Sequence, residues 1–551
     1  MLLGIDVGGT HTDAVLIDKG GIKSTFKAKT DKQNLFDTII TALKEVTSEV
    51  NVKEIKNINL STTLSTNAII ENKLEKTGLF ISSGPGINPE NFKIGDNTYI
   101  IEGSINHRGS EILKLDTAAL EKNIKECVKE GVKVFAAVTK FSTRNNIQEM
   151  QVKDSLKSNA DFVTLGHLLS SQLSFPRRAA TAYYNSAVWR INSNFLTSVI
   201  DALKKMGIDA PVNILKADGG TMPAEVSKSL SVESILSGTA ASVMGITALC
   251  KITDDAVVLD IGGTTTDIAL FASGVPLIEK DGISIGKIPT LVRSLQNRSI
   301  GIGGDSAISI INGEVKVGPE RKGPSAAEGG IEPTLIDAMN CAGMTNHFNK
   351  EKSIEAIKKL SEKNKLSPPD VASKAIEFAV KKIKDEIDKL LFEVNQKPVY
   401  TVHEMLQGRK IAPKKIYIIG GPAKAFADVM KGDLEIIVPE NHSVANAIGS
   451  TLAKTTFESE LFSDTGKEKM VIPNIGIKES VSKNYTLQSA EKDLISYTKK
   501  YLEKQGYRES DLNIEIVESS NFRMIADYFS SGNDIRVKCQ IKPGVMMNLY
   551  K

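Results

Sequence analysis

Two short stretches of this 551-residue chain carry the same set of small and polar residues. They read Ile5-Asp6-Val7-Gly8-Gly9-Thr10-His11-Thr12-Asp13 and Leu259-Asp260-Ile261-Gly262-Gly263-Thr264-Thr265-Thr266-Asp267. Two adjacent glycines let backbone N–H groups turn toward an anion with no Cβ in the way. The threonine that follows adds a hydroxyl donor. The pattern therefore predicts phosphate-binding turns, with these candidate residues: Gly8, Gly9, Thr10, Gly262, Gly263 and Thr264.

The aspartate in front of each glycine pair calls for another role, because a carboxylate repels a phosphate. Asp6 and Asp260 are predicted to be the catalytic and metal-binding residues, which hold Mg²⁺ or orient water or an attacking oxygen. Asp13 and Asp267, at the far end of each motif, are expected to brace the hairpins. A single copy of the motif is equally consistent with an ordinary hairpin between core strands.

The motif occurs twice without a gap, with aliphatic and β-branched residues on both sides of each turn. Each copy is therefore expected to be a strand, a tight turn and a second strand. A repeat over such a long separation predicts two domains of like topology. Two such hairpins that face each other would hold a triphosphate from both sides.

Other glycine-rich segments do not form a known nucleotide signature. A Walker loop is excluded at Gly282…Gly286-Lys287 by the spacing and by Ile288. Gly301-Ile302-Gly303-Gly304 has Ser306 where a dinucleotide fingerprint needs glycine. Gly303 and Gly304 stay candidates for nucleotide contact. Gly420 and Gly421 follow the predicted strand 416–419 and would leave room for a flat adenosine, although a plain strand-to-helix turn explains them as well.

Apolar periodicity predicts the elements that position these turns. Strands are expected over 22–28, 57–61 and 212–216, and helices over 34–50, 68–71, 178–206, 233–250, 368–394 and 442–455. The hydroxyl-rich segment 61–67 is predicted to be a loop that either binds an anion or caps a helix. The small-residue helix 233–250 is expected either to border the cleft or simply to pack closely. Beyond 456 the pattern predicts a helix over 488–505 and strands over 512–518, 522–528 and 534–541.

Composition sets the class of protein. The net charge is +3, which gives no electrostatic case for a nucleic-acid or membrane partner. The four cysteines are scattered without a CxxC pair, which favours free thiols in a reducing compartment. The first residues read as a strand, and no apolar run approaches the roughly 20 residues that span a bilayer. A cytoplasmic location is therefore expected.

The order of these motifs resembles the hydantoinase A/5-oxoprolinase family. Besides the two hairpins, the resemblance rests on Ser61-Thr62-Thr63, Leu236-Ser237-Gly238-Thr239-Ala240-Ala241, Val317-Gly318-Pro319-Glu320 and Gly420-Gly421-Pro422, and covers about residues 1–455. It implies an α/β fold of duplicated actin/sugar-kinase/Hsp70-like ATPase lobes with a central nucleotide cleft. The expected domains are 1–170, 171–455 and a small C-terminal α+β appendage over 456–551.

The resemblance also implies ATP-dependent hydrolysis of a cyclic amide such as a hydantoin, 5-oxoproline or a lactam. ATP, Mg²⁺, a hydantoinase B-like subunit and a homo-oligomer are the implied cofactors and partners. Two residues depart from the family pattern: His11 replaces an aromatic residue, and Thr239 replaces a proline. Large members of the family also have a longer C-terminal portion.

Three other functions remain open at this point. The chain could be the ATP-using subunit of a ketone carboxylase, a non-catalytic ATP-driven switch such as a reactivating factor, or a sugar or acid kinase. Iron–sulfur activators need paired cysteines, and the scattered cysteines argue against that class.

Overall fold

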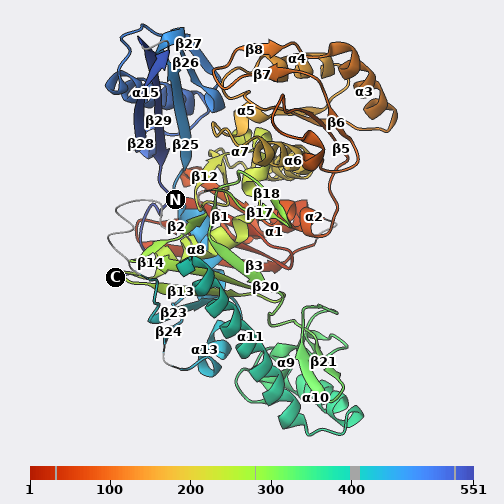
Figure 1. Ribbon diagram of the computed structural model, residues 1–551. Coiled ribbons are helices and arrows are strands. Elements are labelled where there is room, and N and C mark those ends of the chain that lie inside the picture. Colours follow the sequence, from red (N-terminus) through yellow and green to blue (C-terminus); the bar gives the residue numbers. More distant parts are fainter. Residues whose placement is uncertain (32–33, 280, 397–409, 433, 527–528, 551) are drawn as a thin grey trace.

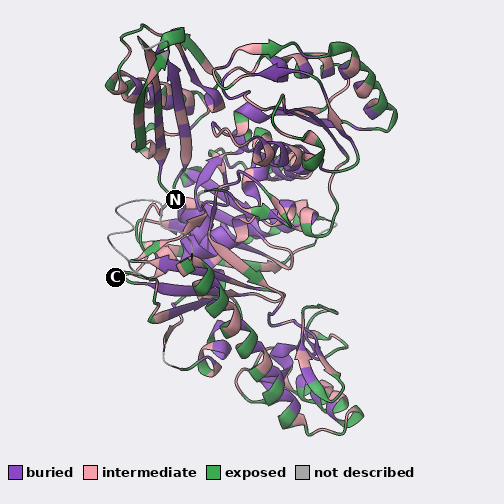
Figure 2. Cartoon of the chain, viewed as in Figure 1, coloured by how far each residue is buried: buried purple, intermediate pink, exposed green. Residues whose placement is uncertain are grey.

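Two large sheets form the centre of the molecule (Figure 1). The computed structural model describes residues 1–31, 34–279, 281–396, 410–432, 434–526 and 529–550. Figure 2 shows this central part mostly in the colour of buried residues. The two phosphate-turn motifs lie in different sheets, one in each.

The first sheet has six strands in the order β12-β11-β4-β1-β2-β3. Their bounds are β1 Leu2–Val7, β2 His11–Asp18, β3 Gly21–Lys29, β4 Asn57–Thr62, β11 Val212–Leu215 and β12 Thr221–Pro223. Aliphatic residues of β1 and β4 pack against helices α1 (Leu35–Val46) and α6 (Phe175–Lys205) in one buried cluster. The chain runs from β12 through α7 (Ala224–Ser229) toward the second sheet.

The second sheet repeats this plan. β13 (Ala256–Ile261) pairs antiparallel with β14 (Thr266–Ala272) and parallel with β23 (Lys415–Ile419), as β1 pairs with β2 and β4. The other strands are β15 Val275–Pro276, β20 Asn297–Ile300 and β24 Glu435–Ile437. The register also repeats, since Asp6 lies opposite Asp13 and Asp260 opposite Asp267. The predicted duplicated α/β lobes are confirmed.

Helices α8 (Ser237–Leu249) and α14 (Ala445–Leu452) lie between the sheets and pack against each other. Glycine makes this contact close. A Cβ on Gly245 would come within 2.1 Å of the Ala445 carbonyl oxygen, and one on Gly449 within 1.9 Å of the Ala241 carbonyl oxygen. The small residues of α8 therefore serve close packing, and the same helix also borders the candidate site described below.

Each lobe carries an insertion. In the first lobe a parallel sheet, β10-β9-β5-β6, is flanked by helices and stands at the top of Figure 1. Its elements are β5 Thr77–Ser82, β6 Thr98–Ile100, β9 Val134–Thr139, β10 Phe162–Leu165, α3 Thr117–Lys129, α4 Ile147–Leu156 and α5 Gly166–Leu169, with the small pair β7 Ser104–Ile105 and β8 Glu111–Leu113.

The second lobe's insertion lies at the bottom of the same view. It contains β21 Ile308–Ile311, β22 Glu314–Val317, α9 Leu335–Cys341 and α10 Lys350–Lys363. The long helix α11 (Pro368–Gln396) leads the chain back to β23, and α13 (Ala423–Val429) follows that strand. The buried apolar residues of α11 pack in the same cluster as those of β13 and α9.

The C-terminal domain is a five-stranded sheet with one long helix. Its elements are β25 Phe457–Asp464, β26 Lys469–Ile472, β27 Ile477–Ser480, α15 Leu487–Lys504, β28 Glu515–Ala526 and β29 Phe529–Ile541. The predicted helix and α+β class agree with this. Strands β25 to β27 were not predicted, and the predicted strands 512–518 and 522–528 belong to a single strand, with 527–528 outside the described residues.

This domain contacts the first lobe in two places. Leu502, Tyr507 and Ile541 join a buried cluster with Met222 and Val226. At the other end, Arg108 of the first lobe's insertion donates two hydrogen bonds to Asp464, at 2.7 and 2.9 Å. The domain thus bridges the main sheet and the insertion of one lobe.

Two expectations need adjustment. The first sheet draws strands from both sides of the expected boundary after residue 170, because α6 returns the chain to the free edge of β4. Segment 61–67 is not a loop. Ser61 and Thr62 end β4, and helix α2 (Leu64–Ile70) begins earlier than predicted because Thr63 already stands at its N-cap.

Candidate functional site

The two glycine turns have the same local geometry. The Gly8 N–H donates to the His11 carbonyl at 2.9 Å, and the Gly262 N–H donates to the Thr265 carbonyl at 2.9 Å. Each bond closes a tight turn between two antiparallel strands. The glycine turns therefore lie at the C-terminal ends of β1 and β13, where the chain reverses into β2 and β14.

The aspartates before the turns are held by hydroxyl groups from neighbouring elements. The Ser61 hydroxyl, on β4, donates to Asp6 at 2.5 Å. The Ser242 hydroxyl, on α8, donates to Asp260 at 2.5 Å, and the Asn446 amide, on α14, donates to the same carboxylate oxygen at 3.0 Å. These contacts fix both carboxylates in orientation.

Burial, together with the negative charges of Asp13 and Asp260, raises the pKa of Asp6 to about 7 against the opposing effect of the Ser61 hydrogen bond. Burial also raises the pKa of Asp13, and Asp260 contributes to that shift. Asp260 belongs to the second lobe. The Ser237 hydroxyl of α8 donates to the Thr62 carbonyl of β4 at 2.8 Å, so the helix that holds Asp260 touches the strand that holds Asp6. The charge of Asp260 accordingly reaches two carboxyl groups of the first lobe.

The outer aspartates take bracing contacts. Asp13 forms an ion pair with Lys27 of β3 at 3.0 Å. Asp267 accepts a hydrogen bond from the Thr239 hydroxyl of α8 at 2.9 Å, and burial, together with the charge of Asp260, raises its pKa to about 6. Thr239, which departs from the family pattern, therefore has a defined partner. These contacts agree with the bracing role expected for both residues.

The candidate glycines fall into two groups. Gly9, Gly262 and Gly421 border open space: a Cβ on Gly421 would meet no atom within 4 Å, and those on Gly9 and Gly262 would meet one atom each, at 3.4 Å. These positions form a cradle with room for a ligand, because no side chain fills the space beside the glycines.

The glycines of the second group contact the backbone of the second turn. The Gly304 N–H donates to the Gly262 carbonyl at 2.9 Å, and a Cβ on Gly303 would lie 2.6 Å from the Gly263 carbonyl oxygen. Gly420 has φ +97°, and a Cβ added to it would lie 2.9 Å from a carboxylate oxygen of Asp260. The structure therefore brings all the predicted glycines of the second lobe together, but Gly303, Gly304 and Gly420 pack against the turn's backbone.

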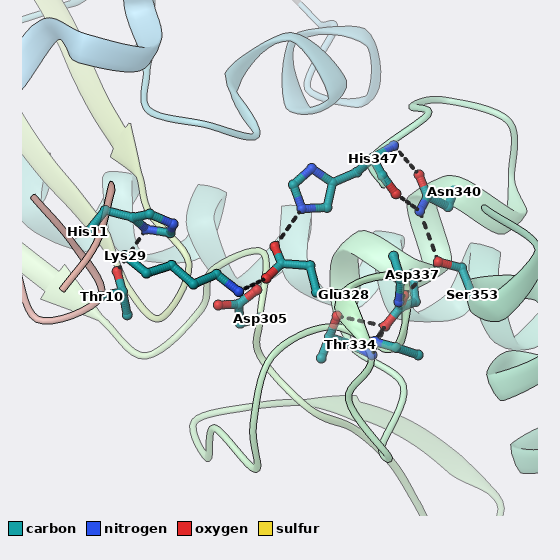
Figure 3. A network of polar contacts seen from close by, with 12 residues as sticks. Thr10, His11, Lys29, Asp305, Glu328, Thr334, Asp337, Asn340, His347 and Ser353 are labelled. Carbon is teal, nitrogen blue, oxygen red and sulfur yellow. Dashed lines mark hydrogen bonds and ion pairs between the residues drawn. The ribbon is translucent and has the colours of Figure 1, made fainter. Parts of the chain in front are cut away.

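Charged side chains of both lobes meet beside the turns (Figure 3). Lys29 of β3 pairs with Glu328 at 2.8 Å, and His347 contacts the other oxygen of Glu328 at 3.0 Å. Arg321 pairs with Asp305 at 2.8 Å. Burial and the nearby cations lower the pKa of His11 to about 4, so its imidazole is neutral near pH 7.

The donor set suits magnesium better than a transition metal. Within the described residues there is no group of three or more His, Cys, Asp or Glu side chains placed to hold a metal ion. Mg²⁺ typically takes one or two carboxylates and completes its shell with water and substrate phosphates. Asp6 and Asp260 supply two carboxylates of that kind.

Several residues of the site escaped the sequence analysis. Ser242 lies in the small-residue helix that was expected near the cleft, so part of its signal was present. Asn446, Lys27, Asp305 and Arg321 belong to segments with no motif, and only the fold brings them to the turns.

Comparison with known proteins agrees with this geometry. The hydantoinase/oxoprolinase family matches residues 178–459, and the N-terminal region of the same family matches residues 2–160. The chain belongs to the hydantoinase/oxoprolinase family. The predicted resemblance is therefore confirmed over both lobes.

The caprolactamase subunit alpha of Pseudomonas jessenii is one relative of this family member. It is 26% identical over 510 residues, which cover 83% of this chain and 70% of the relative. Among solved structures, an acetone carboxylase superposes with a TM-score of 0.74 at 18% identity, over 99% of this chain and 88% of that one. The ATP-dependent caprolactamase of P. jessenii gives 0.66 at 20% identity, over 98% and 87%. Both structures share the fold of this family member.

The helices that the structure describes in this family member include none that is long and apolar enough to cross a membrane.

Proposed function

We propose that this protein uses ATP to hydrolyse a cyclic amide of the hydantoin, 5-oxoproline or lactam type. One observation carries the proposal: two glycine turns, each preceded by a hydroxyl-held aspartate, face each other from opposite lobes. The relative named caprolactamase subunit alpha supports the substrate class.

The chemistry explains why ATP is needed. Resonance makes an amide carbonyl a poor electrophile, and phosphoryl transfer to the amide oxygen converts it into a good one. Catalysis of such a transfer is mainly positioning and charge stabilisation. The N–H groups of Gly9 and Gly263 would donate to the phosphates, with the hydroxyls of Thr10 and Thr264. Gly8 and Gly262 would shape the turns, because their own N–H groups close them.

The remaining predicted site residues are assigned in the same way. Asp6 and Asp260 would hold Mg²⁺ and orient the attacking oxygen, with Ser61, Ser242 and Asn446 fixing the carboxylates. Mg²⁺, when bound, would neutralise phosphate charge. Gly421 would lie against the adenosine, and Gly303, Gly304 and Gly420 would keep the second turn in place.

A ketone carboxylase subunit is the second candidate. The observation that favours it is the superposition on acetone carboxylase over 99% of this chain. The carboxylase needs a separate partner subunit, whereas the amidohydrolase acts either alone or as one subunit of a complex. We propose a hydantoinase B-like chain as partner, a homo-oligomer and a cytoplasmic location for this protein. A relative named as a subunit supports the first of these.

The deciding experiment measures ADP, phosphate and ring-opened product from the purified chain with MgATP. The panel contains lactams of several ring sizes, hydantoins, 5-oxoproline, and ketones with bicarbonate. Substrate-dependent ADP release with ring opening supports the amidohydrolase. ADP release only with a ketone and bicarbonate supports the carboxylase subunit, and turnover that ignores every small molecule but responds to an added protein supports a switch.

A further inference from the structure

An ion pair outside the sequence motifs lies directly over the second phosphate turn. Asp305 is attached to that turn twice: its N–H donates to the Gly263 carbonyl at 2.6 Å, and its Oδ2 lies 2.7 Å from the position of a Cβ on Gly263. The same Oδ2 accepts a hydrogen bond from Nη2 of Arg321 at 2.8 Å. Arg321 is therefore held beside the cradle through a single intervening carboxylate.

A carboxylate in this place needs a cation, because it would otherwise repel the phosphates. Arg321 supplies that charge. A guanidinium carries five N–H donors in a fixed fork, and the bond to Asp305 uses one edge of it. The Arg321 side chain keeps 33% of its surface exposed, against 15% for Asp305. The guanidinium can thus donate to a second anion without leaving Asp305.

The first phosphate turn approaches the loop that carries Arg321. His11 follows Thr10 in that turn and lies opposite Lys29 in the register of β2 and β3. Lys29 forms an ion pair with Glu328, seven residues after Arg321 in the same loop, and Figure 3 shows Asp305 beside this pair. Side chains around this loop therefore connect the second turn, through Asp305, with the strand that flanks the first turn.

We infer that Arg321 binds the terminal phosphoryl group of ATP, held in place by Asp305 as a positioning residue. This inference rests on the proposed use of ATP. Planar bidentate donors match phosphoryl oxygens, and lysine does not reproduce their geometry. The charge that accumulates on the transferred group is the charge that such a donor stabilises.

The test is calorimetry of the purified full-length chain with MgATP and with MgADP. Arg321→Ala is expected to weaken ATP binding about ten- to hundredfold, the usual range for lost charge-assisted hydrogen bonds. ADP binding should change by less than about threefold, because ADP lacks the group that Arg321 contacts. Arg321→Lys should lie between wild type and Arg321→Ala for ATP. Asp305→Asn keeps a hydrogen-bonding group but frees Arg321, so it should also reduce the preference for ATP over ADP.

The matched control is Arg536→Ala, which removes another arginine–aspartate pair, in the C-terminal domain. It should leave both affinities unchanged. The inference is overturned if Arg321→Ala binds ATP like wild type, or if it loses ATP and ADP affinity equally. Failure of the proposed use of ATP would look different, because the wild-type chain itself would then bind neither nucleotide.

Discussion

The two hairpins share a backbone plan and differ in how their charges are balanced. In the first lobe Asp13 is paired with a lysine, and in the second lobe Asp267 is held by the neutral hydroxyl of Thr239. Asp6 receives one hydroxyl donor, whereas Asp260 receives a hydroxyl and an amide. Duplication thus preserved the turn and the register, while the neighbouring helices and strands came to supply different partners. The difference suggests that the lobes divide the work, with the second lobe holding its carboxylate more firmly.

We expect the largest effect from replacing Asp6 and Asp260, which tests whether the two lobes contribute differently to turnover. Asp260→Asn is expected to lower ATP turnover by about a thousandfold, the upper range for losing a preorganised electrostatic group. The substitution keeps the size of the side chain, so the melting temperature should change little. Turnover is followed by ADP release, beside Asp428→Asn as a surface control. Asp6→Asn completes the comparison. Near-wild-type turnover in Asp260→Asn would remove this residue from the mechanism.

Substitution of the second glycine of each turn distinguishes an effect on ATP binding from an effect on the stability of the fold. Gly9→Ala has room in the folded chain, where the added Cβ meets only Asn67 at 3.4 Å, so we expect about tenfold weaker ATP binding at an unchanged melting temperature. Gly263→Ala would press on Asp305 at 2.7 Å. It should weaken ATP binding and also destabilise the fold by about 1–3 kcal/mol, as overpacking does. Calorimetry and thermal melting of both variants measure the difference, and equal melting temperatures would contradict it.

The sequence predicted the hairpins because all of their information is local. Asp6 to Asp13 and Asp260 to Asp267 carry turn, register and donors within a few residues. The donors to the aspartates come from far along the chain, so Ser61 gave a partial signal and Asn446 gave none. Strand β25 was missed because polar residues such as Ser459, Ser463 and Asp464 occupy buried positions, which removes the alternation of polar and apolar residues, and β26 and β27 have only four residues each. The expected boundary after residue 170 could not anticipate that β11 adds to the edge of β4, which is a long-range pairing.

The two bracing contacts should respond differently to salt. Lys27→Met leaves Asp13 without its ion pair, and Thr239→Val removes one of two hydroxyl contacts of Asp267, that of Ser299 remaining. We expect each change to lower the free energy of unfolding by about 1–2 kcal/mol at low salt. The Lys27 side chain is partly exposed, so solvent weakens its ion pair. High salt screens the ion pair and leaves the hydroxyl contact largely unaffected. The loss in melting temperature should therefore shrink with salt for Lys27→Met alone, and parallel behaviour of the two variants would show that the braces are equivalent.

His11 marks the smallest difference between the hairpins, since threonine takes its place in the second. The imidazole is neutral above about pH 4, so His11→Phe should change ATP affinity less than about threefold at pH 7. A histidine whose pKa is lowered on folding weakens the fold as pH falls from its unfolded value toward the folded one, because the unfolded chain binds the proton first. As the pH falls from about 6.5 to about 4, the His11→Phe variant should therefore lose less of its free energy of unfolding than wild type. Melting temperatures across this range check the sign, and an identical pH profile would contradict it.

The placement of the C-terminal domain has a mechanical consequence. It contacts both the main sheet and the insertion of the first lobe, through the Tyr507 cluster and the Arg108–Asp464 pair. A domain attached at two points works as a strut that fixes the insertion relative to the main sheet of that lobe. The second lobe's insertion is attached through α11 and reaches the other lobe by Lys29–Glu328. The Lys29 side chain is 67% exposed, so salt can screen that crossing, whereas the buried Tyr507 cluster does not respond to salt.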